Sequence, residues 1–142
     1  MRTGFSYLYI DQECSVIEPR LTVFEQTERF NTGNWAEHEL KSILNRYLFP
    51  YDTWDKGCAC LSGGEKIRLL FCCLMIGNNA PDVFILDEPT NNLDIQSVEI
   101  ITAAIKSYRG TVLLISYDHY FVKEIKINRS IKLFDTGSVI KI

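Results

Sequence analysis

A continuous apolar run that ends on two acids is the feature that most constrains how this chain folds. The run, Val83–Leu86, follows a proline and is followed directly by Asp87 and Glu88 in "PDVFILDEP". A strand that is apolar at every position is typical of a parallel sheet with helices on both faces. The segment therefore predicts a fully buried parallel strand. Its two acids are expected at the carboxyl edge of the sheet, where α/β proteins bind ligands.

The elements around this strand predict an α/β fold whose first half is mostly helical. Apolar residues recur at helical spacing before and after the strand, and Asp94 is a helix-capping residue type at the start of one such stretch. The predicted helices lie at 23–29, 34–49, 62–76, 95–109 and 118–125. Further strands are predicted at 5–10 and at 111–116, the latter also buried. A closing hairpin is expected to turn at Asp135, Thr136 and Gly137.

Composition excludes several classes of protein. The 142 residues are enough for one ordinary domain or for a fragment of a larger one, and the net charge of -3 gives no general attraction to nucleic acid or anionic membranes. No signal peptide and no apolar run long enough to span a bilayer is present, which favours a cytoplasmic protein without a membrane-spanning segment. The five cysteines are expected to be reduced thiols, because their pairs are too closely spaced for disulfides or an ordinary zinc site.

The stretch "LSGGEKIRLLF" is the first candidate binding feature. Ser62 and Glu65 form an S-x-x-E capping box, and the same pattern alone would mark only a well-capped helix. Gly63 and Gly64 lie between them, and glycine in the first turn lowers the stability of a helix. That cost is compensated where a ligand must approach the backbone N–H groups, and such a helix start favours a phosphate.

The acids Asp87 and Glu88 are the second candidate feature. Neighbouring residues on a strand point in opposite directions, so the two carboxylates are expected to have different tasks. In nucleotide hydrolases one such acid holds Mg²⁺ and another positions or activates water. The alternative is that the pair caps the following turn. No glycine in the chain is followed by lysine, so a P-loop of the form G-x-x-x-x-G-K-[ST] is absent from it.

Taken in order, "LSGGEKIRLL", "VFILDE" and "NNLD" resemble the signature, Walker B and D-loop of an ATP-binding-cassette (ABC) ATPase domain. The form "DEPTNNLD", with Glu65 after the glycines, most resembles the ABC-F subfamily. The resemblance implies part of a P-loop NTPase sheet with a helical signature subdomain. It also implies a soluble twin-cassette ATPase that uses ATP and Mg²⁺ and acts on ribosomes and their RNA, in translation or antibiotic resistance.

The resemblance assigns roles residue by residue. Ser62, Gly63 and Gly64, with Glu65, would contact the γ-phosphate of ATP held by a second cassette. Asp87 would hold the metal and Glu88 would be the general base. Asp94 would close the D-loop at the nucleotide. Gln12 resembles the Q-loop glutamine, which contacts Mg²⁺ and the attacking water.

One position departs from the family pattern. The switch motif of the family reads Ser-His-Asp, whereas this chain has Tyr117 between Ser116 and Asp118. A phenol can donate a hydrogen bond to a γ-phosphate, but its ordinary pKa near 10 prevents imidazole-like proton exchange at neutral pH. Hydrolysis is therefore expected to be slowed. His119 is a possible substitute, with a plain surface histidine as the alternative.

By this resemblance residues 1–142 form one partial cassette. A strand and Q-loop occupy about 1–12, the helical signature subdomain 13–80, and Walker B, D-loop, switch and hairpin 81–142. Without Walker A, the isolated chain is expected to be inactive. Two alternatives stay open: a non-catalytic module that docks on a partner cassette, and the C-terminal lobe of an SMC-like chromosome-maintenance or repair ATPase.

Overall fold

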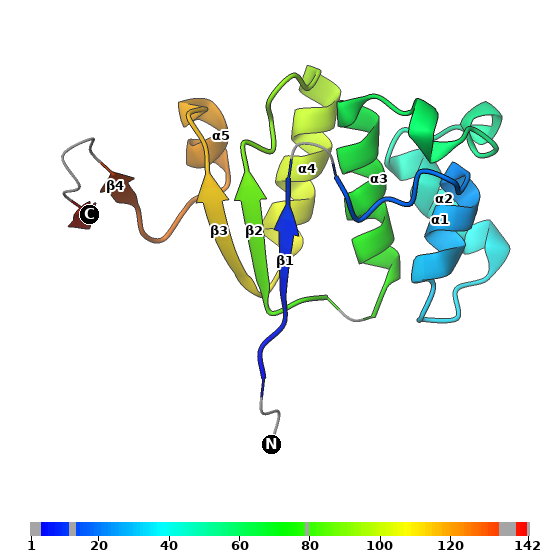
Figure 1. Cartoon of the computed structure of the whole chain (residues 1–142), viewed down its shortest axis with the longest axis horizontal. Helices are drawn as coiled ribbons and strands as arrows, with labels where there is room; N and C mark the ends of the chain where they lie inside the picture. Colours follow the sequence, from blue (N-terminus) through cyan, green and yellow to red (C-terminus); the bar gives the residue numbers. More distant parts are fainter. Residues whose placement is uncertain (1–3, 12–13, 79, 134–138, 142) are drawn as a thin grey trace.

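The computed structural model describes residues 4–11, 14–78, 80–133 and 139–141. Its parallel sheet has the order β1-β2-β3, and a separate antiparallel pair, β4 and β5, lies near the C-terminus (Figure 1). The strands are β1 (Tyr7–Ile10), β2 (Val83–Asp87), β3 (Thr111–Ile115), β4 (Ile131–Leu133) and β5 (Val139–Lys141). The α-helices are α1 (Val23–Phe30), α2 (Glu37–Arg46), α3 (Gly63–Ile76), α4 (Ile95–Ser107) and α5 (His119–Glu124).

These elements confirm the predicted α/β class and the order of its helices and strands. The helix predicted to run to Pro50 is shorter than expected. It ends at Arg46, because Leu48 has a positive φ of 61° that no α-helix can accommodate. The segment expected to be loop contains two short 3₁₀ turns, Tyr51–Thr53 and Cys58–Cys60. The predicted hairpin is present as β4 and β5, but its turn at 135–137 lies outside the described residues.

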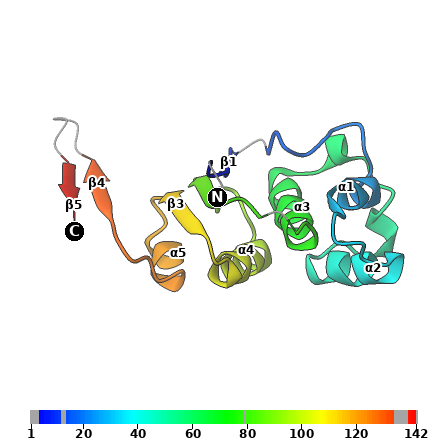
Figure 2. The same cartoon turned by 90° about the horizontal axis from the view of Figure 1, so that it is seen from below.

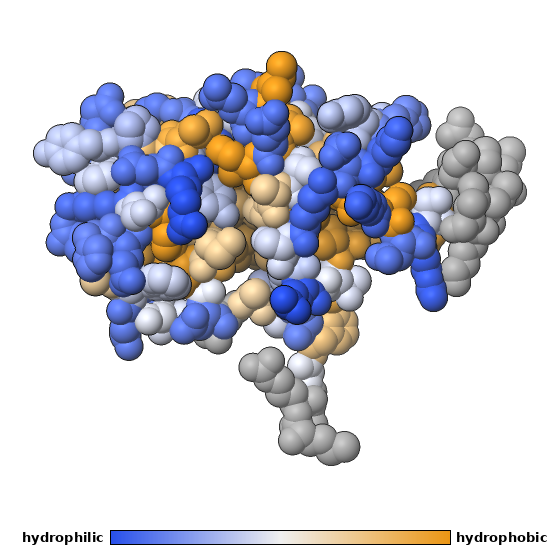
Figure 3. Space-filling view, turned by 180° about the vertical axis from the view of Figure 1, so that it is seen from behind, coloured by the Kyte–Doolittle hydropathy of each residue, from blue (hydrophilic) through white to orange (hydrophobic). Residues whose placement is uncertain are grey.

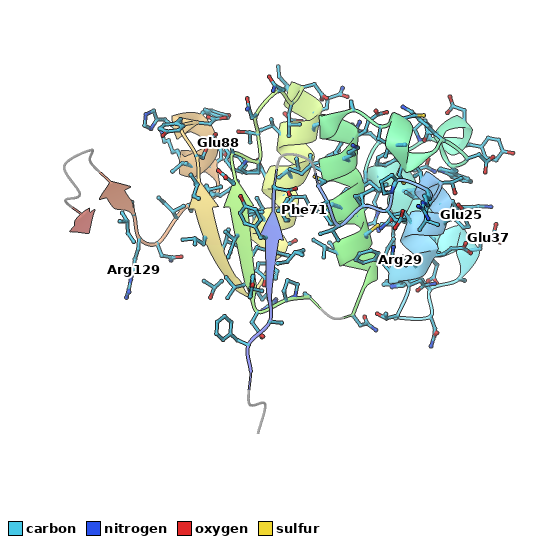
Figure 4. The ribbon with its side chains drawn as sticks, viewed as in Figure 1. Glu25, Arg29, Glu37, Phe71, Glu88 and Arg129 are labelled. Atoms are coloured by element: carbon cyan, nitrogen blue, oxygen red, sulfur yellow. The ribbon has the colours of Figure 1, made fainter. Side chains whose placement is uncertain are left out.

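Helix α3 is the centre of the fold. It packs against α1 and α2 on one side and against α4 on the other, and nearly all of its side chains from Ile67 to Cys73 are buried. Phe71 lies between α3 and the sheet, with its ring centroid 6.3 Å from that of Phe84 on β2 (Figure 4). At the other end of α3, the indole N–H of Trp35 donates to the carbonyl of Ile76 at 3.0 Å.

The expectation that β2 and β3 are buried on both faces is wrong for β3, which is exposed on one face, and β2 is buried on one face and only partly buried on the other. Helices α4 and α5 both lie on one side of the sheet, and none of the described helices covers the other side (Figure 2). Leu113 and Ile115 on β3 are consequently 51% and 49% exposed, and so is Tyr9 on β1, at 45%, for which no burial was predicted. The sequence pattern still identified the strands correctly, because consecutive apolar side chains of a strand point to opposite faces of the sheet. It could not show that only one face is covered within this chain.

The topology brings the N-termini of three helices to one edge of the sheet. Strands β2 and β3 both run toward this edge, and α3, α4 and α5 all begin there (Figure 1).

The side of the molecule on which helices cover the sheet is mostly hydrophilic, with small apolar patches (Figure 3). Within the described ranges, no helix combines the length and the apolar character needed to cross a bilayer.

The burial of α3 leads to a first prediction. Leu70 is fully buried, whereas Met75 on the same helix is 48% exposed. Replacing Leu70 by Ala should lower the free energy of unfolding by about 3 kcal/mol, because it removes buried apolar area and leaves a cavity. Met75→Ala, the matched control, should cost less than about 1 kcal/mol. Urea denaturation followed by circular dichroism measures both. Equal losses would contradict the placement of α3 at the centre.

Candidate functional site

A cleft of about 410 Å³ opens at the carboxyl edge of the sheet. It is bordered by the end of β2, the start of α3 and the turn that leads into α4. Among the described residues that line it, four are carboxylates and none is Lys or Arg. The residues that line it are Asp11, Ser62, Gly63, Gly64, Ile67, Asp87, Glu88, Pro89, Asn91, Asn92, Leu93 and Asp94.

The start of α3 forms one wall of the cleft. The hydroxyl oxygen of Ser62 accepts a hydrogen bond from the N–H of Glu65 at 3.2 Å, and the carboxylate of Glu65 accepts from the N–H of Ser62 at 2.8 Å. The predicted capping box is therefore present. It leaves the N–H groups of Gly63 and Gly64 without an acceptor among the described residues. Two backbone donors at a helix N-terminus thus face an open cleft, as anion-binding helix starts do.

The two glycines differ in their surroundings. A Cβ atom on Gly63 would meet nothing within 4 Å, whereas one on Gly64 would lie 3.0 Å from Cδ2 of Leu93. Gly63 therefore faces the open cleft. Gly64 allows the turn before α4 to pack closely against the start of α3, so these two walls are in direct contact.

Glu65 lies behind the cleft wall rather than on it. Its second carboxylate oxygen accepts a hydrogen bond from Nζ of Lys56 at 2.9 Å. Partial burial pushes the pKa of Glu65 upward. The bonds from Lys56 and Ser62 outweigh that effect, and the pKa lies below its ordinary value. Glu65 is therefore ionised at neutral pH and paired with a cation.

The turn between β2 and α4 connects the acids to the start of α3. The N–H of Asn91 donates to the carbonyl of Glu88 at 3.1 Å, and Asn92 has a positive φ of 58°. Asp94 caps α4 as predicted, because its carboxylate accepts from the N–H and from the hydroxyl of Ser97, each at 2.8 Å. These bonds, led by the one from the Ser97 N–H, hold the pKa of Asp94 below its usual value.

The two acids at the end of β2 are held by different neighbours. The hydroxyl of Tyr9 on β1 donates to Asp87 at 3.1 Å, and this bond to a carboxylate raises the pKa of Tyr9. The carboxylate of Glu88 instead accepts from the N–H of Tyr117, after β3, at 3.0 Å. Glu88 lies near the start of α5, at the edge where the strands end (Figure 4). Among the described contacts neither carboxylate caps the turn after β2, and the two acids have separate hydrogen-bond partners.

Tyr117 is placed at the site by its backbone. Its side chain is 88% exposed, while its N–H holds Glu88. The exposed phenol is free to approach a ligand at this edge. Asp118 caps α5 by accepting from the N–H of Phe121 at 3.0 Å, and His119 is the exposed first residue of that helix.

The structure thus brings most of the predicted site residues to one edge. Ser62, Gly63, Gly64, Asp87, Glu88 and Asp94 line the cleft, Glu65 lies behind it, and Tyr117 borders Glu88. The predicted residue Gln12 lies outside the described part of the chain.

Several residues at the site were not predicted from the sequence, among them Asp11, one of the four carboxylates on the cleft lining, and three residues that contact predicted ones. Tyr9 bonds to Asp87, Leu93 packs against Gly64, and Lys56 pairs with Glu65. Tyr9 could have been found from the pairing of β1 with β2, which aligns Tyr9 with Ile85, two residues before Asp87. No sequence signal identifies Lys56, because its contact depends on the path of an irregular loop.

Comparisons with known proteins give relatives of this chain. A family model described as "ABC transporter" matches residues 2–91. ABC transporter F family member 2 of Arabidopsis thaliana is 44% identical over 104 residues, which are 73% of this chain and 15% of that protein. F family member 5 of the same plant is 41% identical over 126 residues, or 89% of this chain and 17% of that protein. The chain therefore spans less than a fifth of the length of these relatives.

Solved structures share the fold at lower identity. The archaeal ribosome recycling factor aABCE1, in complex with ribosomal stalk protein aP1, matches with a TM-score of 0.66 at 20% identity. That match covers 92% of this chain and 25% of that one. The ATP-binding cassette MJ0796, a dimer in a post-hydrolysis state bound to ADP and Pi, matches with a TM-score of 0.61 at 20% identity. Here 84% of this chain and 56% of that one are covered.

The surroundings of the two glycines give opposite expectations for alanine. Gly63→Ala should raise the free energy of unfolding by about 0.5 kcal/mol, because alanine favours the helix and its methyl group enters open space. Gly64→Ala should give no such gain, because the new methyl group forces Leu93 to move. Urea denaturation of the two variants measures the difference. A gain at Gly64 equal to that at Gly63 would contradict the close contact with the turn.

The cap on α4 gives a pH prediction. Because the pKa of Asp94 is lowered in the folded chain, its capping contribution is present above the unfolded pKa and is lost as pH falls through the folded one. The side-chain NMR titration of Asp94 should therefore have its midpoint below about 3.9. Ser97→Ala should raise that midpoint, since the hydroxyl bond is lost while the backbone bond remains. A midpoint at or above the ordinary value would contradict the cap.

Proposed function

Because the chain belongs to the ABC transporter family, we propose that it is part of an ATPase cassette of the ABC-F subfamily, which binds and hydrolyses Mg-ATP between two cassettes. The observation that carries the proposal is the convergence at one cleft of two free backbone donors, two separately held acids and a capped turn. Gly63 and Gly64 supply the donors, and Asp87 and Glu88 supply the acids. Since the whole relatives are much longer, the activity is proposed for the complete protein.

The residues present suit a magnesium ion and a nucleotide. Mg²⁺ prefers carboxylate oxygens, and the cleft offers four carboxylates without a basic residue on its lining. Asp87, whose carboxylate is oriented by the hydroxyl of Tyr9, would hold the ion. Gln12 would also contact the ion. The ion neutralises phosphate charge when it is bound. The Ser62 hydroxyl and the amides of Gly63 and Gly64 would bind the γ-phosphate of a nucleotide carried by the partner cassette.

Glu88 is proposed as the general base. Its carboxylate is held at the edge of the sheet by the Tyr117 N–H, with its remaining oxygen lone pairs available to accept a proton from water. The Tyr117 phenol would donate a hydrogen bond to phosphate in place of the family's histidine. Asp94 would keep the D-loop turn at the interface through its cap on α4.

The absence of basic residues from the cleft lining also bears on the isolated chain. The triphosphate of ATP would meet four carboxylates there without a compensating cation from this chain's cleft wall. We therefore expect weak or no ATP binding by the chain alone. This observation also favours a second candidate function, a non-catalytic module that docks on a partner cassette through Ser62–Gly64.

One of the solved structures that share the fold suggests where the complete protein acts. That structure holds an archaeal ribosome recycling factor in complex with a ribosomal stalk protein. We propose by analogy that the complete protein works on the ribosome, in the cytoplasm. Co-sedimentation of the complete protein with ribosomes, with and without ATP, would test this role.

ATP turnover tests the proposed function directly. The chain alone should show negligible hydrolysis, because the Lys and backbone loop of Walker A are absent from its sequence. Supplying a Walker A segment from an F-family relative, fused ahead of the chain, should give ATPase activity. In that fusion Glu88→Gln should lower the turnover number at least about a hundredfold and retain bound ATP. Turnover by the chain alone, or a fully active Glu88→Gln fusion, would refute the assignment.

The switch position gives a separate prediction. In the active fusion, Tyr117→His should raise the turnover number, because imidazole exchanges protons near neutral pH and phenol does not. Tyr117→Phe should lower it, since the ring remains but the hydroxyl donor is lost. Both variants keep the backbone N–H that holds Glu88, so they isolate the side chain. Equal rates for all three side chains would show that only the backbone of residue 117 contributes.

A further inference from the structure

The capping residue Glu65 places a negative charge beside the two free amides at the start of α3. It is the third residue of the helix, directly after Gly63 and Gly64, and one of its oxygens is bound to the Ser62 N–H at 2.8 Å. A capping box forms equally well with Gln at this position, which carries no charge. Glu65 therefore provides the cap at the cost of repelling any phosphate that approaches the same helical turn.

Lys56 is held in place to offset that charge. Its carbonyl accepts a hydrogen bond from the N–H of Val23, the first residue of α1, at 3.0 Å. The next residue, Gly57, forms a bridge with Thr22, and the N–H of Cys58 donates to Leu21 at 2.8 Å. The loop that carries Lys56 is thus fixed against the start of α1, and its Nζ reaches the free oxygen of Glu65 at 2.9 Å.

This ion pair differs from the other ion pairs of the described chain in its burial. The difference lies in the carboxylate: the side chain of Glu65 is 23% exposed, whereas those of Glu124 and Glu37 are 45% and 68% exposed. The lysines of the three pairs are similarly exposed, at 35% for Lys56, 42% for Lys106 and 33% for Lys41. A less exposed pair is screened less by water and salt, so its charges act more strongly on their surroundings. The cleft in front of the pair already holds four carboxylates. An unpaired fifth carboxylate behind the amides would add to the repulsion that the four carboxylates of the cleft exert on phosphate.

We infer that Lys56 is a positioning residue of the phosphate site: by pairing with Glu65 it cancels the charge of the α3 cap, so that the amides of Gly63 and Gly64 can receive a polyphosphate. The inference rests on the proposed function and deepens it. It assigns a role to a residue of the loop before α3, outside the segments that resemble the family motifs. Lys56 acts through Glu65 and makes no phosphate contact of its own.

Tripolyphosphate binding to the chain itself tests this role. Because the carboxylates of the cleft are expected to weaken binding of a bare polyphosphate, the probe is added as its Mg²⁺ complex. It is titrated to high concentration at fixed ionic strength into the ¹⁵N-labelled chain, and the amide shifts of Gly63 and Gly64 report an apparent Kd. Lys56→Gln should weaken binding about three-fold, as expected for one partly screened charge. Glu65→Gln should bind at least as well as the unaltered chain. The double variant Lys56→Gln/Glu65→Gln should recover the original affinity, because neither charge is then present.

Lys106→Gln is the matched control, since it removes a lysine from another Lys–Glu pair and changes the net charge equally. It should leave the affinity at Gly63 and Gly64 unchanged. The difference between Lys56→Gln and the original chain should shrink as salt is added. Urea denaturation of each variant shows whether the fold is retained. If the pair were merely structural, the double variant would bind tripolyphosphate as weakly as Lys56→Gln does.

Three outcomes would overturn the inference. If the double variant binds as weakly as Lys56→Gln, then Lys56 contacts phosphate directly or acts only on the fold. If Lys56→Gln and Lys106→Gln weaken binding equally, the effect is one of net charge. If the two glycine amides do not respond to the probe in the original chain, they do not receive phosphate. Failure of the proposed function appears in a different measurement, the ATP turnover of the Walker A fusion, so the two failures are distinguishable.

Discussion

The burial of α3 is the constraint on which the rest of the structure depends. This helix is packed against α1 and α2 on one side and α4 on the other, and Phe71 joins it to the sheet. A helix fixed so firmly has a fixed N-terminus, and that end lies at the carboxyl edge of β2. The two backbone amides of its first turn are therefore positioned by the hydrophobic core rather than by a flexible loop, which favours precise recognition of a ligand.

The polar groups at this edge are organised by bonds between neighbouring elements. Tyr9 holds Asp87 from one adjacent strand, and the backbone of Tyr117 holds Glu88 from the segment after the other. The turn before α4 is fixed by the Asp94 cap and by contact with Gly64. Each wall of the cleft thus supports another wall. A change in one of them, such as a substitution at Tyr117, acts on a site whose other parts remain in place.

Much of the site was predictable because its residues lie in short, local patterns. The capping box of Ser62 and Glu65 and the Asp94 cap involve residues three positions apart, so the sequence alone identified them. The position of the acids after β2 followed from the apolar run that precedes them. The full burial predicted for β3 was wrong and that predicted for β2 was only partly right, because an apolar strand pattern does not reveal how many layers cover a sheet. The end of α2 was misplaced because the positive φ at Leu48 has no signature in its residue type.

The sequence by itself determined the α/β class, the order of the elements, the capped start of α3 and the resemblance to an ATP-binding cassette. The class, the order of the elements and the capped helix start depend on periodicity and on contacts within one helical turn, whereas the resemblance depends on three short motifs. Only the tertiary structure decided that Lys56 neutralises Glu65, that Leu93 closes against Gly64, and that one face of the sheet is left open. The physical reason is that these contacts join segments whose separation in space is set by loop paths and by the packing of helices. Neither of these is encoded in a local pattern of residue types.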